Sequence, residues 1–94
     1  MEIRHEVVKK KGSFVIEDNG KRVGELNYLM SGPSEITLYH TEVDEKFRGE
    51  GLGKDLVEAA VKHARENGLK IIAKCPFAAH VFNEKPEYKD VLKG

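Results

Sequence analysis

The chain has 94 residues, of which 39% are hydrophobic and 34% charged, a composition typical of one globular domain over residues 1–94 with a thin core. Its 16 basic and 16 acidic residues cancel, and no apolar run approaches the roughly 18 residues of a membrane helix, which argues against nucleic-acid and membrane partners. One cysteine allows neither an internal disulfide nor an all-cysteine metal site, no metal-ligand spacing occurs, and the N-terminus lacks an apolar leader, so we expect a cytoplasmic protein without a metal.

The first part of the chain, from Ile3 to Val43, predicts four short strands, because alternating apolar and polar runs are separated by turn residues. The expected turns are Lys11-Gly12, Asp18-Asn19-Gly20 and Ser31-Gly32-Pro33-Ser34. Connections this short favour antiparallel neighbours. We therefore expect an antiparallel meander whose fourth strand covers residues 36–43.

After Val43 the apolar period changes from that of a strand to that of a helix. The apolar residues that recur at helical spacing are Leu52, Leu56, Ala59, Ala60 and Ala64, and Asn67-Gly68 supplies the stop signal. Residues 69–74 predict a short buried strand. Because a strand, a helix and a strand form a right-handed crossover, this fifth strand should lie parallel to the fourth.

The C-terminal segment predicts short helices, since Pro76 fits the first position of a helix and Pro86 interrupts the pattern again. Together these elements indicate an α/β (α+β) fold class with an antiparallel meander, a crossover helix, a parallel fifth strand and short C-terminal helices. The glycine-rich turn over residues 48–53 then lies between the fourth strand and the helix. Backbone amides at such a turn can bind an anion, most often phosphate.

Two common phosphate-binding patterns do not fit this turn. In the Walker loop the first glycine would stand where the chain has Arg48, and Asp55 replaces the hydroxyl that would hold magnesium. In the dinucleotide fingerprint, counted from Gly49, Lys54 occupies the position of the third glycine, and the turn follows the fourth strand rather than the first. A different class of anion-binding loop is therefore expected.

The stretch Arg48-Gly49-Glu50-Gly51-Leu52-Gly53 resembles the R-x-x-G-x-G loop of the GNAT-type N-acetyltransferases, which lies between a fourth strand and the following helix. The stretches "YHTEV", "CPF" and "PEY" extend the likeness over nearly the whole chain, to the small GNAT-like family of about one hundred residues. Larger relatives have helices after the first strand and extra C-terminal strands, which often shape the acceptor site, and both are missing here. Members often carry His before Pro-Glu-Tyr, where this chain has Lys85.

The resemblance implies a GNAT-like fold and an acetyl-CoA-dependent N-acetyltransferase that moves an acetyl group to an amine of a small molecule or protein. Acetyl-CoA is then the cosubstrate, with coenzyme A as product and no metal. Its pyrophosphate would lie on the amides of the loop, because bare glycines and the positive end of the helix favour an anion. The residues implied in binding it are Val43, Arg48, Gly49, Glu50, Gly51, Leu52, Gly53 and Lys54.

Cys75 ends the fifth strand and precedes Pro76, so it should lie at or near a helix N-cap. There the helix dipole and free amides favour the thiolate and lower the thiol pKa, which makes the sulfur nucleophilic. A lone cysteine is equally often a buried and inert residue. The resemblance implies the functional interpretation, with Cys75 at the reacting centre.

His40 and Glu42 lie near the end of the fourth strand, just before the loop. Under strict alternation both share one face with Leu38, and Thr41 lies opposite, although a bulge would reverse this. Either His40 or Glu42 could act as a general base for the amine or for Cys75. A hydrogen-bonded polar pair at a strand end is the structural alternative.

Other residues that could do chemistry are predicted to be structural. His5 lies on an early strand, His63 on the surface of the long helix and His80 in the last helix. Larger acetyltransferases often use a tyrosine on the last helix as an acid, but Phe82 lacks a hydroxyl and Tyr88 lies farther along the chain.

Two mechanisms and two classes of function stay open from the sequence. The transfer can be direct, or it can pass through an acetylated Cys75. The alternative to an enzyme is a non-catalytic coenzyme A-binding or interaction module. An exposed sheet edge on so small a protein is compatible with a monomer or a weak dimer.

Overall fold

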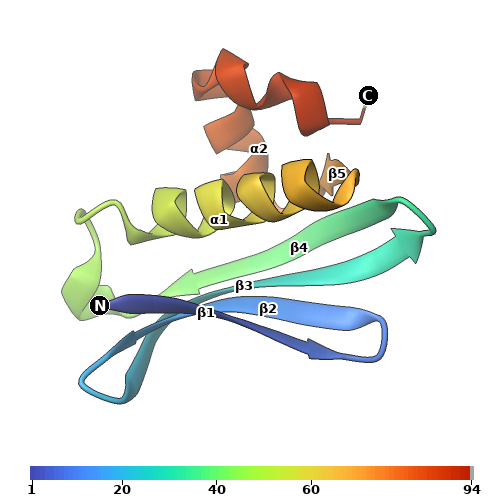
Figure 1. Cartoon of the computed structure of the whole chain (residues 1–94). Coiled ribbons are helices and arrows are strands. Elements are labelled where there is room, and N and C mark those ends of the chain that lie inside the picture. The colour runs from blue at the N-terminus through green and yellow to red at the C-terminus, as the bar shows by residue number, and fades with distance from the viewer. Residues whose placement is uncertain (94) are drawn as a thin grey trace.

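The computed structural model describes residues 1–93, in which five strands form one mixed sheet in the order β1-β2-β3-β4-β5 (Figure 1). The strands are β1 (Glu2–Val8), β2 (Lys11–Asp18), β3 (Lys21–Gly32), β4 (Glu35–Val43) and β5 (Lys70–Ala73). The first four are antiparallel neighbours, and β5 pairs parallel to β4. The predicted meander and parallel fifth strand are both confirmed.

Two α-helices and two short 3₁₀ segments complete the fold. They are η1 (Glu45–Phe47), α1 (Leu52–Asn67), α2 (Pro76–Glu84) and η2 (Pro86–Val91). The helix α1 ends as predicted, because Gly68 takes a left-handed conformation at φ 65° and its N–H bonds the carbonyl of Ala64. Within residues 1–93 none of the helices has both the length and the apolar character to cross a membrane.

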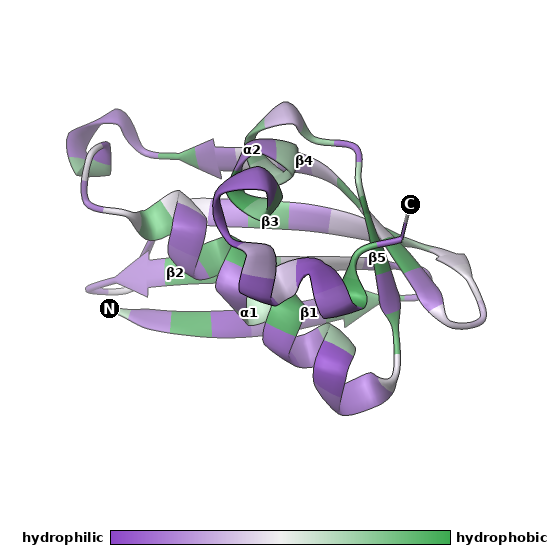
Figure 2. Cartoon of the chain, turned by 90° about the horizontal axis from the view of Figure 1, so that it is seen from above, coloured by the Kyte–Doolittle hydropathy of each residue, from purple (hydrophilic) through white to green (hydrophobic). Residues whose placement is uncertain are grey.

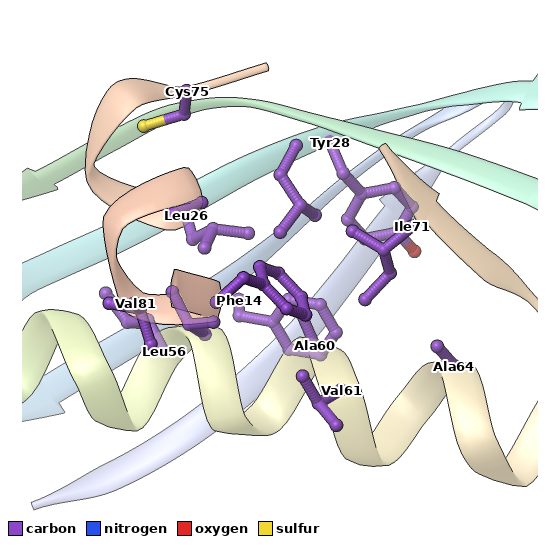
Figure 3. Packing of buried hydrophobic residues seen from close by; sticks show 14 of the residues in the cluster. Phe14, Leu26, Tyr28, Leu56, Ala60, Val61, Ala64, Ile71, Cys75 and Val81 are labelled. Atoms are coloured by element: carbon purple, nitrogen blue, oxygen red, sulfur yellow. The ribbon is translucent and has the colours of Figure 1, made fainter. Parts of the chain in front are cut away.

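The core lies between the sheet and α1, which covers one sheet face (Figure 1). Figure 3 shows Leu26 and Tyr28 of β3 in one buried cluster with Leu56 and Ala60 of α1. In Figure 1, α2 and η2 lie on the side of α1 away from the sheet. The molecule therefore has three layers, namely the sheet, α1, and α2 with η2. The predicted site residues lie near the starts of α1 and α2.

The first turn differs from its prediction. The pairing of Val8 with Lys11 places the turn at Lys9-Lys10, with Lys9 at φ 58°, and puts Lys11-Gly12 inside β2. Gly12 lies against the ring of Tyr28 on β3, and a Cβ added there would come 2.2 Å from Tyr28 Cζ. Gly12 is therefore required for cross-strand packing and not for a turn, which local sequence does not distinguish.

A bulge in β4 reverses the alternation that the sequence predicts for its end. Leu38 pairs with Tyr28, whereas His40 pairs with Asn27, so Tyr39 is an extra residue on β4. Beyond this point His40 and Glu42 no longer share a face with Leu38. The expectation of strict alternation is wrong for this segment, and the bulged alternative is confirmed.

After the bulge the side chains that face α1 are Thr41 and Val43. Thr41 pairs with the buried Leu26 of β3, and Val43 packs against the core cluster. The other face of β4 carries His40 and Glu42, which are exposed. The bulge therefore decides which polar residues of β4 can meet those of α2.

The strands β4 and β5 separate at the same place. Their parallel pairing ends at Leu38 and Ala73, and the amides of Lys74 and Cys75 both bond the Leu38 carbonyl, at 3.0 and 2.9 Å. Beyond Leu38, β4 continues to Val43 without pairing to β5. This leaves one side of the β4 backbone open at residues 39–43, next to the glycine-rich loop.

Candidate active site

The loop before α1 presents backbone amides without side-chain cover. Gly49 and Gly51 have φ values of 87° and 78°, a region that favours glycine. Gly51 is the N-cap of α1 and makes no side-chain cap hydrogen bond. Because the first amides of a helix have no partner within it, those that follow Gly51 can bind an anion together with the positive end of the helix dipole.

Gly53 has a different reason to be glycine. Its φ is not left-handed, but a Cβ added there would come 2.6 Å from the ring carbon Cζ of Phe77, at the start of α2. The first turns of α1 and α2 therefore approach each other closely only because Gly53 has no side chain. The side chain of the next residue, Lys54, reaches α2 as well, with its Nζ 3.5 Å from a Glu84 oxygen.

These elements enclose a cleft of about 580 Å³, which lies within the range of small-molecule sites. It is lined by Thr41, Glu42, Val43, Phe47, Arg48, Gly49, Gly51, Leu52, Gly53, Lys54 and Phe77. Of the residues that the sequence implied for acetyl-CoA, Glu50 alone does not line the cleft. Cys75 and His40, two of the predicted catalytic residues, do not line it either.

Cys75 lies directly behind the cleft, at the N-cap of α2 (Figure 3). It is only 6% exposed, and its Sγ lies 3.3 Å from Oγ1 of Thr41, which does line the cleft. The Cys75 side chain makes no cap hydrogen bond. The bulge in β4 is what turns Thr41 toward Cys75.

Opposing influences act on the Cys75 thiol. Burial raises its pKa, but the Thr41 hydroxyl and the amides of Ala78 and Phe77 at the start of α2 stabilise the thiolate. The net pKa is lower than the ordinary value of a cysteine. The surroundings of the thiol therefore favour the thiolate in spite of its burial.

The other two predicted catalytic residues stand apart from Cys75. His40 Nε2 lies 3.4 Å from Glu42 Oε1, and the two side chains are 52% and 69% exposed. They lie on the face of β4 opposite Thr41. The fold brings His40 and Glu42 to each other, and it brings Thr41 instead of either of them to Cys75.

Sequence reasoning missed three residues of the site. Strict alternation places Thr41 on the face opposite His40 and Glu42, and no sequence pattern assigns a role to Phe47 or Phe77. The bulge at Tyr39 carries no local sequence signal, so Thr41 was not identifiable. Phe77 follows the proline that opens α2, and it lies next to Gly53 because of the tertiary packing of α1 against α2.

The residues predicted to be structural have packing or surface roles. His5 stacks on Phe14 with ring centroids 4.4 Å apart, its Nε2 lies 2.6 Å from the Tyr28 hydroxyl, and its ring lies 4.5 Å from that of His63 on α1. Burial lowers the pKa of both histidines. His80 is exposed beside Glu84 of the same helix.

The aromatic residues Phe82 and Tyr88 lie outside the cleft. Tyr88 donates its hydroxyl to Glu58 on α1 at 2.9 Å and does not line the cleft. Phe82 is buried in the core. Within residues 1–93, no group of three or more histidine, cysteine, aspartate or glutamate side chains could hold a metal ion.

The chain is similar to known proteins along most of its length. A profile of the GCN5-related N-acetyl-transferase family matches residues 13–91. Protein NATD1 of Xenopus tropicalis is 34% identical over 85 residues, which cover 89% of this chain and 78% of that protein. An uncharacterized N-acetyltransferase of Methanocaldococcus jannaschii is 36% identical over 67 residues, 65% of this chain and 30% of that protein.

Solved structures agree with these sequence matches. The solution structure of a GCN5-like protein from Staphylococcus aureus has a TM-score of 0.74 at 39% identity, over 97% of this chain and 88% of that chain. The ribosomal-protein-S18-alanine N-acetyltransferase of Escherichia coli has a TM-score of 0.69 at 20% identity, over 83% and 53%, which shows a common fold. The family profile, the relatives and the fold together show that the chain belongs to the GCN5-related N-acetyltransferases, the family that the glycine-rich loop predicts.

Proposed function

We propose that this protein transfers the acetyl group of acetyl-CoA to an amine, with the loop over residues 48–54 as the coenzyme A site and Cys75 at the reacting centre. The observation that carries the proposal is the continuous cleft from the uncapped N-terminus of α1 to Thr41, whose hydroxyl contacts the Cys75 sulfur. Acetyl-CoA supplies the acetyl group as a thioester.

The loop suits a pyrophosphate. Gly49 and Gly51 leave the amides unobstructed, and a Cβ added at either glycine would meet no other atom within 4 Å. Arg48 adds a positive charge at the cleft wall, and α1 adds its dipole. The absence of a side-chain cap on α1 supports this assignment, because an anion would satisfy amides that the chain itself leaves without a cap.

The open backbone of β4 suits the rest of the molecule. Residues 39–43 lack a β5 partner and run from the loop to Thr41. The amides of an extended pantetheine arm can pair with such a strand edge, as a peptide does when it adds to a sheet. The arm would then direct the thioester from the loop toward Thr41 and Cys75, and Val43 and Phe77 supply apolar walls.

Cys75 is proposed as the nucleophile of a covalent route. Its thiolate would attack the acetyl carbonyl, forming an S-acetyl bond as coenzyme A leaves, and the amine would then take the acetyl group and regenerate the thiol. The lowered pKa of Cys75 supports this role, since the thiolate is the reactive form. In the direct route, Cys75 would instead position the thioester or protonate the departing thiolate.

His40 or Glu42 is proposed as the base that removes a proton from the amine. Both lie on the outer face of β4, across the strand from Cys75. An amine can use either side chain only if it approaches the open strand edge from that face. The exposed position of the pair suits a water-accessible acceptor that must lose a proton before it reacts.

The first test is a titration of coenzyme A and acetyl-CoA into the isotope-labelled protein, followed by amide shifts. We expect shifts centred on residues 48–54 and Cys75. Gly51→Glu places bulk and negative charge at the loop and should weaken binding by about 100-fold. Gly68→Glu is the matched control, because Gly68 has a similar φ and equally open surroundings at the other end of α1. Equal affinities of the two variants would contradict the loop assignment.

The second test separates the chemical routes. Mass spectrometry of the protein after exposure to acetyl-CoA alone should detect one acetyl group on Cys75, and Cys75→Ala controls for acetylated lysines. Transfer to amines without such an adduct would support the direct route. Binding at the loop without release of coenzyme A to any amine would identify the module as non-catalytic and overturn the proposed activity.

A further inference from the structure

The two edges of the sheet differ in how they are covered. At β5, Leu92 forms a bridge with Ile71, and the Lys93 amide bonds the Ile71 carbonyl at 2.8 Å. At the opposite edge, β1 pairs only with β2 over the described residues 1–93. Figure 2 shows hydrophobic segments near both ends of β1, where Ile3 is 43% and Val7 57% exposed. An uncovered edge with exposed apolar residues is a template for another strand.

The turn that follows β1 decides which of its backbone groups are free. A two-residue turn joins Val8 to Lys11, so these two residues form a hydrogen-bonded pair. Bonded and non-bonded pairs alternate along an antiparallel ladder, and β1 runs without a register shift. The N–H and C=O groups of Ile3, His5 and Val7 therefore point away from β2, toward solvent.

We propose that β1 pairs with β1 of a second copy of this chain, antiparallel and two-fold symmetric, with His5 opposite His5. The free backbone groups allow this register, because Ile3 then lies opposite Val7 and every hydrogen-bonded pair joins residues whose groups point outward. A register shifted by one residue would place outward groups opposite inward ones and make no ladder. The two sheets become one continuous sheet of two symmetric halves.

The charges of β1 select the same register. With His5 on the axis, Arg4 of each copy lies opposite Glu6 of the other, on the sheet face away from α1. A shift of two residues in one direction places the Arg4 residues of the two copies opposite each other. A shift in the other direction does the same to the two Glu6 residues. Opposite charges across a pair stabilise a sheet, and like charges destabilise it. Of these three registers, all of which the backbone allows, only the one with His5 opposite His5 pairs opposite charges.

The side chains on the other face are also complementary in this register. Ile3 of one copy meets Val7 of the other on the side of α1, where Ile3 lines the groove that β1 forms with that helix. This groove, of about 470 Å³, is lined by residues of both signs, among them Asp55 and Lys62 of α1. Pairing of the edges would close one side of the groove in each copy.

The interface would be small and distant from the cleft. One pair of short strands buries much less than the roughly 800 Å² per partner of a stable interface, so we expect dissociation constants of about 0.1 to 1 mM. The cleft lies beside β4, at the far side of β2 and β3 from β1. Association should therefore leave coenzyme A binding unchanged, and the inference does not depend on the proposed activity.

Charge exchange tests the register directly. In sedimentation equilibrium, Arg4→Glu alone and Glu6→Arg alone should each be monomeric, because each places like charges opposite each other twice. A mixture of the two variants should associate at least as well as the wild-type protein. Glu2→Arg is the matched control: it reverses a charge on the same strand, but Glu2 lies opposite Val8 and its change should leave association unaffected. A wild-type protein that stays monomeric at about 1 mM, or a mixture that does not associate, overturns the proposal.

Hydrogen exchange gives a second readout that does not use variants. The amides of Ile3, His5 and Val7 should gain protection as protein concentration rises. Those of Arg4 and Glu6 bond β2 and should be protected equally at all concentrations. Concentration-dependent protection at any other surface, or the same dependence for both sets of amides, would contradict pairing through β1.

Discussion

Two regions of this molecule lower the pKa of a titratable side chain, for opposite reasons. At the start of α2, hydrogen bonds that stabilise the thiolate lower the pKa of Cys75 although burial opposes them. Between β1 and α1, burial itself lowers the pKa of His5 and His63. The first environment favours the charged form of its side chain, and the second disfavours it.

This difference distinguishes the proposed reactive position from a packing position. A thiolate at neutral pH is a nucleophile, so an environment that stabilises it suits chemistry. The His5 imidazole, which stacks on Phe14 and bonds Tyr28 beside His63, suits a packed wall between strand and helix. The direction of a pKa shift is the same in both regions, and only its cause identifies the candidate site.

The largest expected effect comes from removing the thiol. We expect Cys75→Ala to lower acetyl transfer by about 100-fold, because the reacting sulfur is lost. His63→Gln, at the other perturbed region, should leave the rate unchanged. Steady-state kinetics with a saturating amine would measure both. Equal rates for the Cys75 variant and the wild-type protein would reduce Cys75 to a packing residue.

A smaller effect is expected when the Thr41 hydroxyl, which stabilises the thiolate, is removed and the sulfur is kept. Thr41→Val preserves shape but removes the hydroxyl 3.3 Å from Sγ, so the pKa of Cys75 should rise. We expect the pH profile of thiol alkylation to move to higher pH and acetyl transfer at neutral pH to fall by about tenfold. Thr41→Ser should restore both properties. An unchanged alkylation profile would mean that the backbone amides of Thr41, Phe77 and Ala78 stabilise the thiolate without the hydroxyl.

Substitution of His40 or Glu42, the exposed pair on the outer face of β4, should lower the rate of acetyl transfer by less than the change at Thr41. His40→Ala or Glu42→Gln should each lower the rate by less than about tenfold, since water or the remaining side chain can accept a proton at an exposed position. The double variant should lose more than either single variant. Its rate should recover at high pH, where the amine is already deprotonated. A double variant with wild-type activity at all pH values would exclude both residues as the base.

The smallest effect is expected at the histidine pair, and it concerns stability. The folded-state pKa of His5 and His63 is lowered, so the unfolded chain binds more protons on acidification. Their contribution to folding stability is complete above the unfolded-state pKa of about 6.5, and it is lost as the pH falls through that value toward the folded-state pKa. We expect the melting temperature to fall by a few degrees between about pH 7 and pH 5. His63→Gln should show a flatter dependence, and an identical one would contradict this origin.

Much of the fold could be predicted from local sequence. The Asn19-Gly20 turn, the glycine stop after Asn67 and the proline starts of α2 and η2 all lie where the sequence predicts them, because each rests on the conformational preference of one or two residues. Gly12 shows the limit of such reasoning. Its missing side chain makes room for the Tyr28 ring on the next strand, which no local pattern indicates.

The candidate site, like the fold, has some features that local sequence predicts and others that it does not. The sequence by itself determined the glycine-rich loop between β4 and α1 and the placement of Cys75 at a helix N-cap, because both depend on neighbouring residues in one segment. Only the tertiary structure decided that Thr41, and neither His40 nor Glu42, meets the thiol. The physical reason is the extra residue Tyr39, which exists only in the pairing of β4 with β3 and turns every side chain beyond it to the other face.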